Sequence, residues 1–157
     1  MTSNLILKIL LMLSTCTLGV FLGTQLAEAA LIVPYWKGLS SEDFFAFYKA
    51  HGKKLQQFYA PLTIAATILP ICTIVCSLLG KTKTLPLMWL MLFFSLLFFS
   101  TFFIYFKAAN YNFTMQTISY EALPNELLKW EKWHWTRIFC EAVAFISGLF
   151  LLLQFKK

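Results

Sequence analysis

Four side chains near the end of the sequence have the types and spacing that could support chemistry. Trp130, His134, Arg137 and Glu141 follow one another at intervals of four, three and four residues. Residues at this spacing lie along one face of an α-helix. An imidazole can give or take a proton near neutral pH, and a guanidinium can stabilise a developing negative charge. The stripe therefore predicts a polar site on one face of a C-terminal helix.

The elements that must position this stripe are membrane-spanning helices. The chain has 157 residues, of which 59% are hydrophobic and 13% are charged, against ~45 to 50% and ~25% in soluble domains. Four apolar runs each approach the ~20 residues that cross a bilayer as a helix. We predict an all-α fold, a single four-helix transmembrane bundle over residues 1–157, with spans at about 5–33, 58–79, 85–107 and 127–155.

The connections carry their own signals. The first apolar run exceeds the ~7 to 15 residues of a signal-peptide core, so we expect a retained helix. Ser40 and Asp43 fit a capping box that opens an amphipathic helix at about 41–59, which lies on the membrane surface or extends span two. Pro61 is expected to start span two, and Asn125 to cap the last helix.

Alternating spans bring most ionisable side chains to one end of the bundle. The N-terminus, the turn at 80–84 and the C-terminus share one membrane face, which has five lysines and no acid. The opposite end collects all seven acids and both histidines. Glu28, His51, Asn110, His134 and Arg137 come from four different helices. Topology predicts that they meet at this end.

Charges inside apolar sequence are expensive, so they usually face the bundle interior and pair with one another. We predict an ion pair of Glu141 with Arg137 along the last helix, and one of Glu28 with Arg137 or His134 between helices. Gln25 lies one turn before Glu28, on the same face. Tryptophan, arginine and histidine near a span end also fit an aromatic belt with side chains that snorkel to the headgroups.

These considerations give a predicted site. The candidate catalytic side chains are His134, Arg137, Glu28 and His51. The candidate substrate-binding side chains are Trp130, Trp133, Tyr59, Asn110 and Glu141. If a metal is bound, its ligands would be His51, His134 and Glu28, although no local spacing matches a metal motif. The sequence identifies no cofactor.

Several segments together resemble a known family. They are a first helix ending with Gly23, Leu26 and Glu28, the stretch PYWKGLSSEDFFAFY at 34–48, an asparagine before the last helix, and W-x-x-W-H-x-x-R at 130–137. This layout resembles the small four-span anthrone-oxygenase-like membrane proteins, many of uncharacterised function. The resemblance implies an oxygenase-like activity, converting polycyclic anthrones to quinones, without a well-defined bound cofactor. It marks Trp133, His134 and Arg137, with Glu28, His51 and Asn110.

Two functions follow as predictions. The first is an integral-membrane oxidoreductase acting on a lipophilic aromatic or quinone-like molecule. The alternative is a non-catalytic subunit or assembly partner, in a homo-oligomer or with another membrane protein, suggested by the small-residue ridge Gly19, Gly23 and Ala27. No basic cluster is interleaved with stacking aromatics, so nucleic acid is not an expected partner. We expect a bacterial inner membrane, with both termini cytoplasmic.

Overall fold

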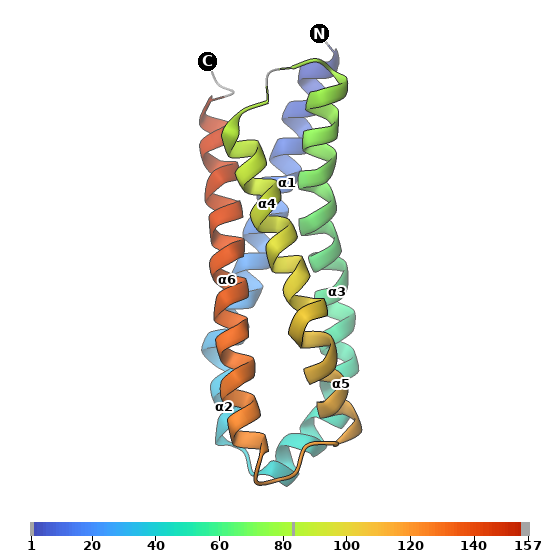
Figure 1. The fold of residues 1–157 in the computed structure, drawn as a ribbon, viewed down its shortest axis with the longest axis vertical. Helices are drawn as coiled ribbons and strands as arrows, with labels where there is room; N and C mark the ends of the chain where they lie inside the picture. The colour runs from blue at the N-terminus through green and yellow to red at the C-terminus, as the bar shows by residue number, and fades with distance from the viewer. Residues whose placement is uncertain (1, 83, 155–157) are drawn as a thin grey trace.

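The computed structural model describes residues 2–82 and 84–154, and this part of the chain is helical with no strand. Four long helices form the bundle: α1 (Thr2–Ala27), α3 (Ser41–Leu79), α4 (Pro86–Thr101) and α6 (Leu123–Gln154) (Figure 1). Short elements extend them: η1 (Glu28–Ile32), α2 (Val33–Gly38), η2 (Phe102–Phe106) and α5 (Lys107–Met115). The predicted all-α four-helix bundle is confirmed.

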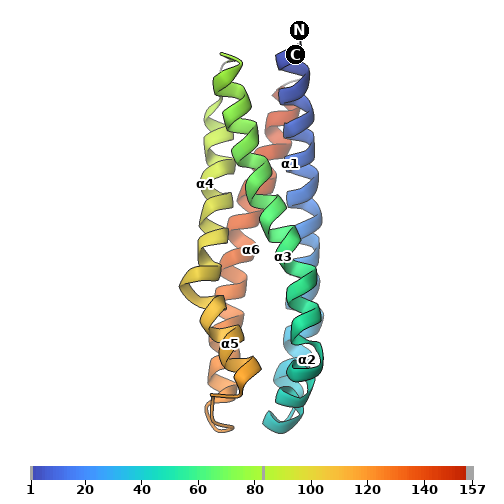
Figure 2. The same cartoon turned by 90° about the vertical axis from the view of Figure 1, so that its right-hand side faces the viewer.

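The helices run alternately up and down. α1 packs against α3 and α6, and α4 packs against the same two helices. Both termini lie at one end of the bundle, and the two longer connections lie at the other (Figures 1 and 2). Four continuous helical segments are long and apolar enough to cross a membrane: Asn4–Gly38, Ser41–Leu79, Pro86–Met115 and Leu123–Gln154. The chain is therefore an integral membrane protein.

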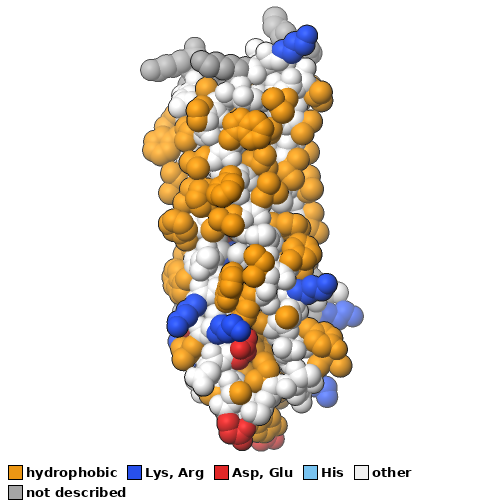
Figure 3. Space-filling view, viewed as in Figure 1, with side chains coloured by type: hydrophobic (Ala, Val, Ile, Leu, Met, Phe, Trp, Pro, Cys, Tyr) orange, Lys and Arg blue, Asp and Glu red, His pale blue; other side chains and the backbone are white. Residues whose placement is uncertain are grey.

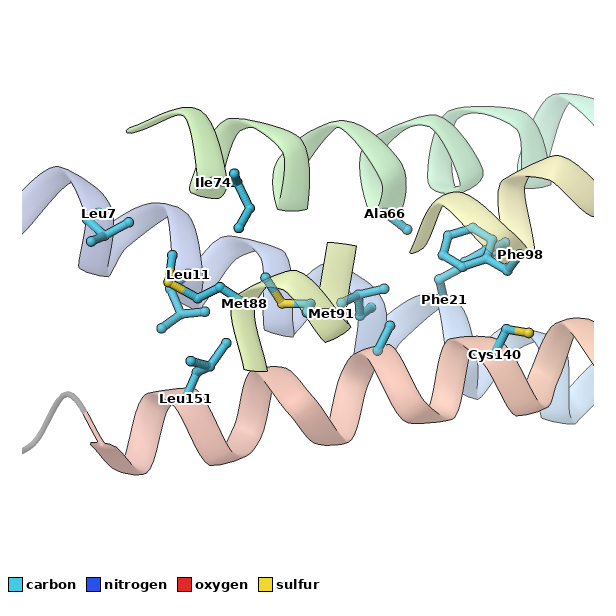
Figure 4. Packing of buried hydrophobic residues seen from close by; sticks show 12 residues of the cluster. Leu7, Leu11, Phe21, Ala66, Ile74, Met88, Met91, Phe98, Cys140 and Leu151 are labelled. Atoms are coloured by element: carbon cyan, nitrogen blue, oxygen red, sulfur yellow. The ribbon is translucent and has the colours of Figure 1, made fainter. Parts of the chain in front are cut away.

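The half of the bundle near the termini is packed by aliphatic and sulfur-containing side chains. Leu11, Met88 and Leu151 meet between the helices (Figure 4). Gly148 of α6 allows close approach to α1, since a Cβ atom there would lie 2.6 Å from Thr15 Oγ1. Helices in lipid are held by such close packing, because lipid tails are as apolar as the side chains themselves.

The other half contains a second core, which we call the aromatic cluster. Its buried members are Val33, Trp36, Phe44, Phe45, Tyr48, Tyr105, Phe106, Ala109, Phe113, Leu123, Leu127 and Trp130. Trp36 lies at its centre, with ring centroids 5.9 Å from Phe44 and 5.3 Å from Trp130. Both contacts are edge-to-face, the arrangement that aromatic quadrupoles favour. The cluster fastens α2 to α3 and α6.

One helical boundary differs from the prediction between spans one and two. The predicted cap is confirmed, because Ser40 Oγ accepts a hydrogen bond from the Asp43 backbone amide at 3.1 Å. The amphipathic segment 41–59 is the first part of α3, so the alternative that it extends span two is confirmed. The expected start of span two at Pro61 is wrong, because α3 continues through Pro61 and Pro70. Each proline removes only one backbone donor, a loss that packed neighbouring helices tolerate in a membrane protein.

The later boundaries also differ. The third span continues past residue 107 through α5 to Met115. The last helix begins at Leu123, so Asn125 lies in its first turn and does not cap it. The turn before the helix supplies the hydrogen-bond acceptor instead. The Ser119 carbonyl oxygen accepts hydrogen bonds from the backbone amides of Ala122 and Leu123, each at 3.1 Å. The predicted end of this span at residue 155 lies outside the described residues.

Candidate functional site

α6 places His134 and Arg137 one turn apart, facing Gln25 and Glu28, which lie one turn apart across the α1–η1 junction. We call these four residues the polar cluster. Gln25 and His134 have no exposed surface, and Glu28 is 4% exposed. The cluster adjoins the aromatic cluster, at the end of the bundle that topology predicted.

Hydrogen bonds within the polar cluster define the state of the imidazole. Arg137 Nη2 donates to Gln25 Oε1 and lies 2.9 Å from His134 Nδ1. His134 Nε2 lies 3.0 Å from the backbone carbonyl oxygen of Gln25. A guanidinium can only donate and a carbonyl can only accept, so His134 is neutral with its proton on Nε2. Both ring nitrogens are thus engaged, and neither is free to exchange a proton with a substrate.

Glu28 supplies the negative charge of the cluster. Its Oε2 atom lies 3.7 Å from Arg137 Nη2 and 3.9 Å from His134 Nε2. The predicted interhelical pairing of Glu28 with Arg137 is confirmed. These separations are too long for hydrogen bonds, and Glu28 Oε2 has no hydrogen-bond partner in the described chain. The Tyr59 side chain of α3 lies close to the same carboxyl group.

The predicted ion pair between Glu141 and Arg137 is not formed. Glu141 is fully buried one turn deeper along α6, and neither carboxyl oxygen has a hydrogen-bond partner among residues 2–82 and 84–154. Arg137 is held instead toward α1 by Gln25 and His134. The guanidinium extends toward α1 and the preceding turn of α6, away from the following turn, which carries Glu141.

Aromatic side chains surround the polar cluster. Trp130 stacks on His134 with ring centroids 4.9 Å apart, and its Nε1 donates to Asn110 Oδ1 at 3.1 Å. The guanidinium carbon of Arg137 lies 4.3 Å from the Phe106 ring centroid, a cation–π contact. Of the predicted residues, Trp130 therefore borders the cluster, and Asn110 is joined to it through Trp130.

Trp133 is placed differently from Trp130. Its ring stacks on Tyr105 with centroids 5.4 Å apart and planes within 9°. Tyr105 in turn donates to Glu126 Oε1 at 2.8 Å. Trp133 is only partly buried, and its ring stacks on Tyr105 and not on His134 or Arg137. Its stacking partner belongs to the aromatic cluster, so Trp133 packs beside that cluster.

Two π-helical segments adjoin the polar cluster. η1 begins with Glu28, and η2 ends with Phe106, whose ring contacts Arg137. A π-helical turn contains an extra residue, which changes the direction of the side chains on it, and such turns recur at functional sites. Both segments interrupt helices that are otherwise regular at this level of the bundle.

His51 does not join the other predicted residues. It is exposed on α3, where its ring lies 4.7 Å from that of Phe47. The inward side of this helix instead passes through Tyr48, Gly52 and Tyr59, which are buried or partly buried. The suggested metal ligands are therefore not assembled, and no three His, Cys, Asp or Glu side chains of the described chain are grouped to hold a metal ion.

Two residues of the site were not predicted. The sequence places Gln25 only on the face of Glu28, yet its side chain and carbonyl hold both Arg137 and His134. An amide inside an apolar run, one turn from a carboxylate, was the available signal. Phe106 had no such signal, because nothing in the sequence distinguishes it from the other phenylalanines of span three as the one that contacts Arg137.

The polar cluster and Glu141 together present buried polar atoms without partners in the described chain: Gln25 Nε2, Arg137 Nε, Glu28 Oε2 and both Glu141 carboxyl oxygens. The first two can donate hydrogen bonds and the others can accept them. Such atoms are uncommon in folded proteins and require an explanation. No family model, curated protein or solved structure matches this chain. The chemistry of these atoms is thus the basis for assigning a role.

Proposed function

We propose that the protein binds a lipophilic aromatic or quinone-like molecule, whose polar end lies at the polar cluster. The observation that supports this is the set of buried, unpartnered polar atoms. A ring carbonyl would accept hydrogen bonds from Gln25 Nε2 and Arg137 Nε, and a phenolic hydroxyl would donate to Glu28. One molecule with both groups would satisfy donors and acceptors together.

The surroundings suit the rest of such a molecule. Phe106 and Trp130 border the cluster, where Arg137 covers one face of the Phe106 ring and His134 covers one face of Trp130, and Tyr59 lies beside Glu28. Aromatic rings contribute large apolar contact areas and prefer defined stacking geometries. A planar ligand dissolved in the bilayer would gain these contacts, whereas a small polar solute would not.

We further propose an oxygenase-type oxidoreductase activity, in keeping with the resemblance to anthrone-oxygenase-like proteins. In that reaction class a ring CH₂ group loses two hydrogens and gains one oxygen atom from O₂, and the second oxygen atom leaves as water. Glu28 would take the first proton, and Arg137 would stabilise the negative charge on the substrate oxygen. His134 becomes a positioning residue that orients Arg137, because both of its nitrogens are engaged.

Ligand titration tests this proposal. The purified protein is titrated with anthrone and with a short-chain naphthoquinone, while tryptophan fluorescence reports binding and absorption reports quinone formation. We expect Glu28→Gln and Gln25→Leu to weaken binding at least tenfold. The matched control is Ser14→Ala, which removes a buried hydroxyl that bonds Thr73 away from the site. Equal affinity in the parent and both site variants would contradict the proposed site.

A role as an assembly partner is the second candidate, and one observation favours it. Gly23 and Ala27 are exposed on α1, and a Cβ atom at Gly23 would meet nothing within 4 Å. Gly19 already packs against Phe145. The outward part of the ridge could therefore receive a helix of a second copy or of another membrane protein. A stoichiometric partner in mild detergent that is lost in Gly23→Ile would support this role.

We propose a bacterial inner membrane as the location, with both termini cytoplasmic. A short basic start before an apolar run favours this orientation, although lysine counts alone favour the opposite one. The test is labelling of Thr82→Cys with an impermeant thiol reagent, in a variant whose native cysteines are replaced. Protection in intact cells and labelling after lysis are expected, and labelling in intact cells would reverse the orientation.

A further inference from the structure

Lysine side chains gather at the level where the lipid-facing surface of the bundle ends. Near the end with the long connections, blue side chains lie at the lower edge of the orange apolar surface, and red side chains lie at the tip (Figure 3). Five exposed lysines here form no ion pair with any described residue: Lys49, Lys53, Lys54, Lys107 and Lys132. We call these five residues the lysine girdle.

The girdle follows the apolar boundary on three helices. On α3, the exposed Phe58 lies four residues beyond Lys54. Before α5, the exposed Ile104 lies three residues before Lys107, and on α6 the half-exposed Trp135 lies three residues beyond Lys132. In each case the lysine is about one helical turn from a large exposed apolar side chain. That is the level of the headgroups, to which long lysine side chains extend.

The remaining charges leave the girdle available to anions. Two further lysines at this end are paired, Lys37 with Glu131 at 2.7 Å and Lys129 with Glu126 at 3.9 Å. Glu42 and Asp43 lie in the first turn of α3, at least six residues from the nearest girdle lysine. At ~1.5 Å per residue this is ~9 Å or more along the helix axis, about one screening length at physiological salt.

We propose that the lysine girdle binds the headgroups of anionic phospholipids. Its positive charges lie on three sides of the bundle, at the depth of lipid phosphates, without internal partners. Attraction between a surface lysine and an anionic leaflet changes affinity about fivefold per residue. Several lysines acting together would therefore collect a shell of anionic lipid around this end, next to the polar cluster.

Native mass spectrometry of the full chain in detergent tests the proposal, with phosphatidylglycerol and phosphatidylcholine as probes. We expect tighter binding of phosphatidylglycerol, and a loss of at least tenfold in its affinity for the variant Lys53→Gln/Lys107→Gln. The matched control Lys37→Gln/Lys129→Gln removes two lysines that are already paired, and a change within about twofold is expected.

Three outcomes would overturn the proposal. One is equal affinity for the two lipids, and another is equal loss of affinity in the girdle and control variants. The third is full competition by millimolar inorganic phosphate, which would indicate a general anion site in place of a lipid site. Circular dichroism of each variant checks that the helices are intact, so that a loss of binding reports the lysines themselves.

Discussion

His134 and Gln25 are joined across the α1–α6 interface, with His134 Nε2 lying 3.0 Å from the Gln25 backbone carbonyl oxygen. The opposite ring nitrogen receives a hydrogen bond from Arg137. The imidazole is therefore a bridge between a main-chain acceptor on one helix and a cationic donor on its own. A bridge of this kind fixes the rotation of α6 relative to α1, because His134 and Gln25 have no exposed surface.

The bridge predicts one tautomer. In protein labelled with ¹⁵N-histidine, His134 should show one protonated and one unprotonated ring nitrogen, with the proton on Nε2. His51 is exposed and gives an internal comparison in the same spectrum. Arg137→Leu should remove the donor to Nδ1 and shift its resonance, while the Gln25 carbonyl, which can only accept, should keep the proton on Nε2. A doubly protonated His134 in the parent protein would contradict the assigned hydrogen bonds.

The Glu28–Arg137 pair predicts strong coupling between two substitutions. Arg137→Gln should lower the free energy of unfolding by about 3 kcal/mol, because it leaves a buried carboxylate without its counter-ion. The double variant Glu28→Gln/Arg137→Gln should recover at least half of this loss. Reversible unfolding in mixed micelles measures both. Lys37→Gln is the control, since its exposed pair with Glu131 should contribute less than about 1 kcal/mol; strict additivity of the single changes would rule out the pair.

Glu141 predicts the opposite behaviour. Because neither carboxyl oxygen has a partner in the described chain, Glu141→Gln should leave the free energy of unfolding within about 1 kcal/mol of the parent, and Glu141→Leu should raise it. Glu28→Leu is the comparison and should be destabilising, because it removes the partner of Arg137. A marked loss of stability in Glu141→Leu would mean that the carboxyl group has a stabilising contact after all.

Two glycines predict a matched pair of results. Gly148→Ala should be destabilising by about 1 to 3 kcal/mol, because the new Cβ atom would lie 2.6 Å from Thr15 Oγ1. Gly23→Ala meets nothing within 4 Å and should be neutral or stabilising by up to about 1 kcal/mol, through better helix propensity. Thr15→Ala should partly rescue Gly148→Ala. Thermal unfolding of Gly148→Ala, Gly23→Ala, Thr15→Ala and the double variant Thr15→Ala/Gly148→Ala measures these changes in stability. Equal effects at the two glycines would exclude a close α1–α6 contact.

Much of the fold follows from simple sequence patterns. The apolar runs predicted the four helices because crossing a bilayer imposes a length and a composition. The pattern of Ser40 and Asp43 predicted a helix start because both partners are local. The predicted helix start at Pro61 was wrong, because α3 continues through this residue. Whether a proline interrupts a helix depends on the packing of the surrounding helices, which a short window of sequence does not reveal.

The site was predictable in part for the same reason. Burial of charge required Glu28 and Arg137 to meet, and they do. Which neighbour Arg137 would choose was not predictable, because the choice between Glu141 and α1 depends on the relative rotation and height of two helices. His51 illustrates the limit. The inward face of α3 at this level passes through Gly52, so the preceding residue, His51, is exposed and lies outside the site.

The length of the helices has a consequence for how this chain folds. α3 has 39 residues and is therefore about 60 Å long, about twice the hydrocarbon thickness of a bilayer. The N-terminal part of α3, before Lys54, extends out of the hydrocarbon, so the hydrophobic effect in water drives the packing of Phe44. The part around Ile74 lies within the hydrocarbon, where that driving force between helices is missing and close packing takes its place. Two parts of one continuous helix are therefore stabilised by different forces. Urea should disrupt the packing of Phe44 against Phe113 while leaving the packing of Ile74 intact.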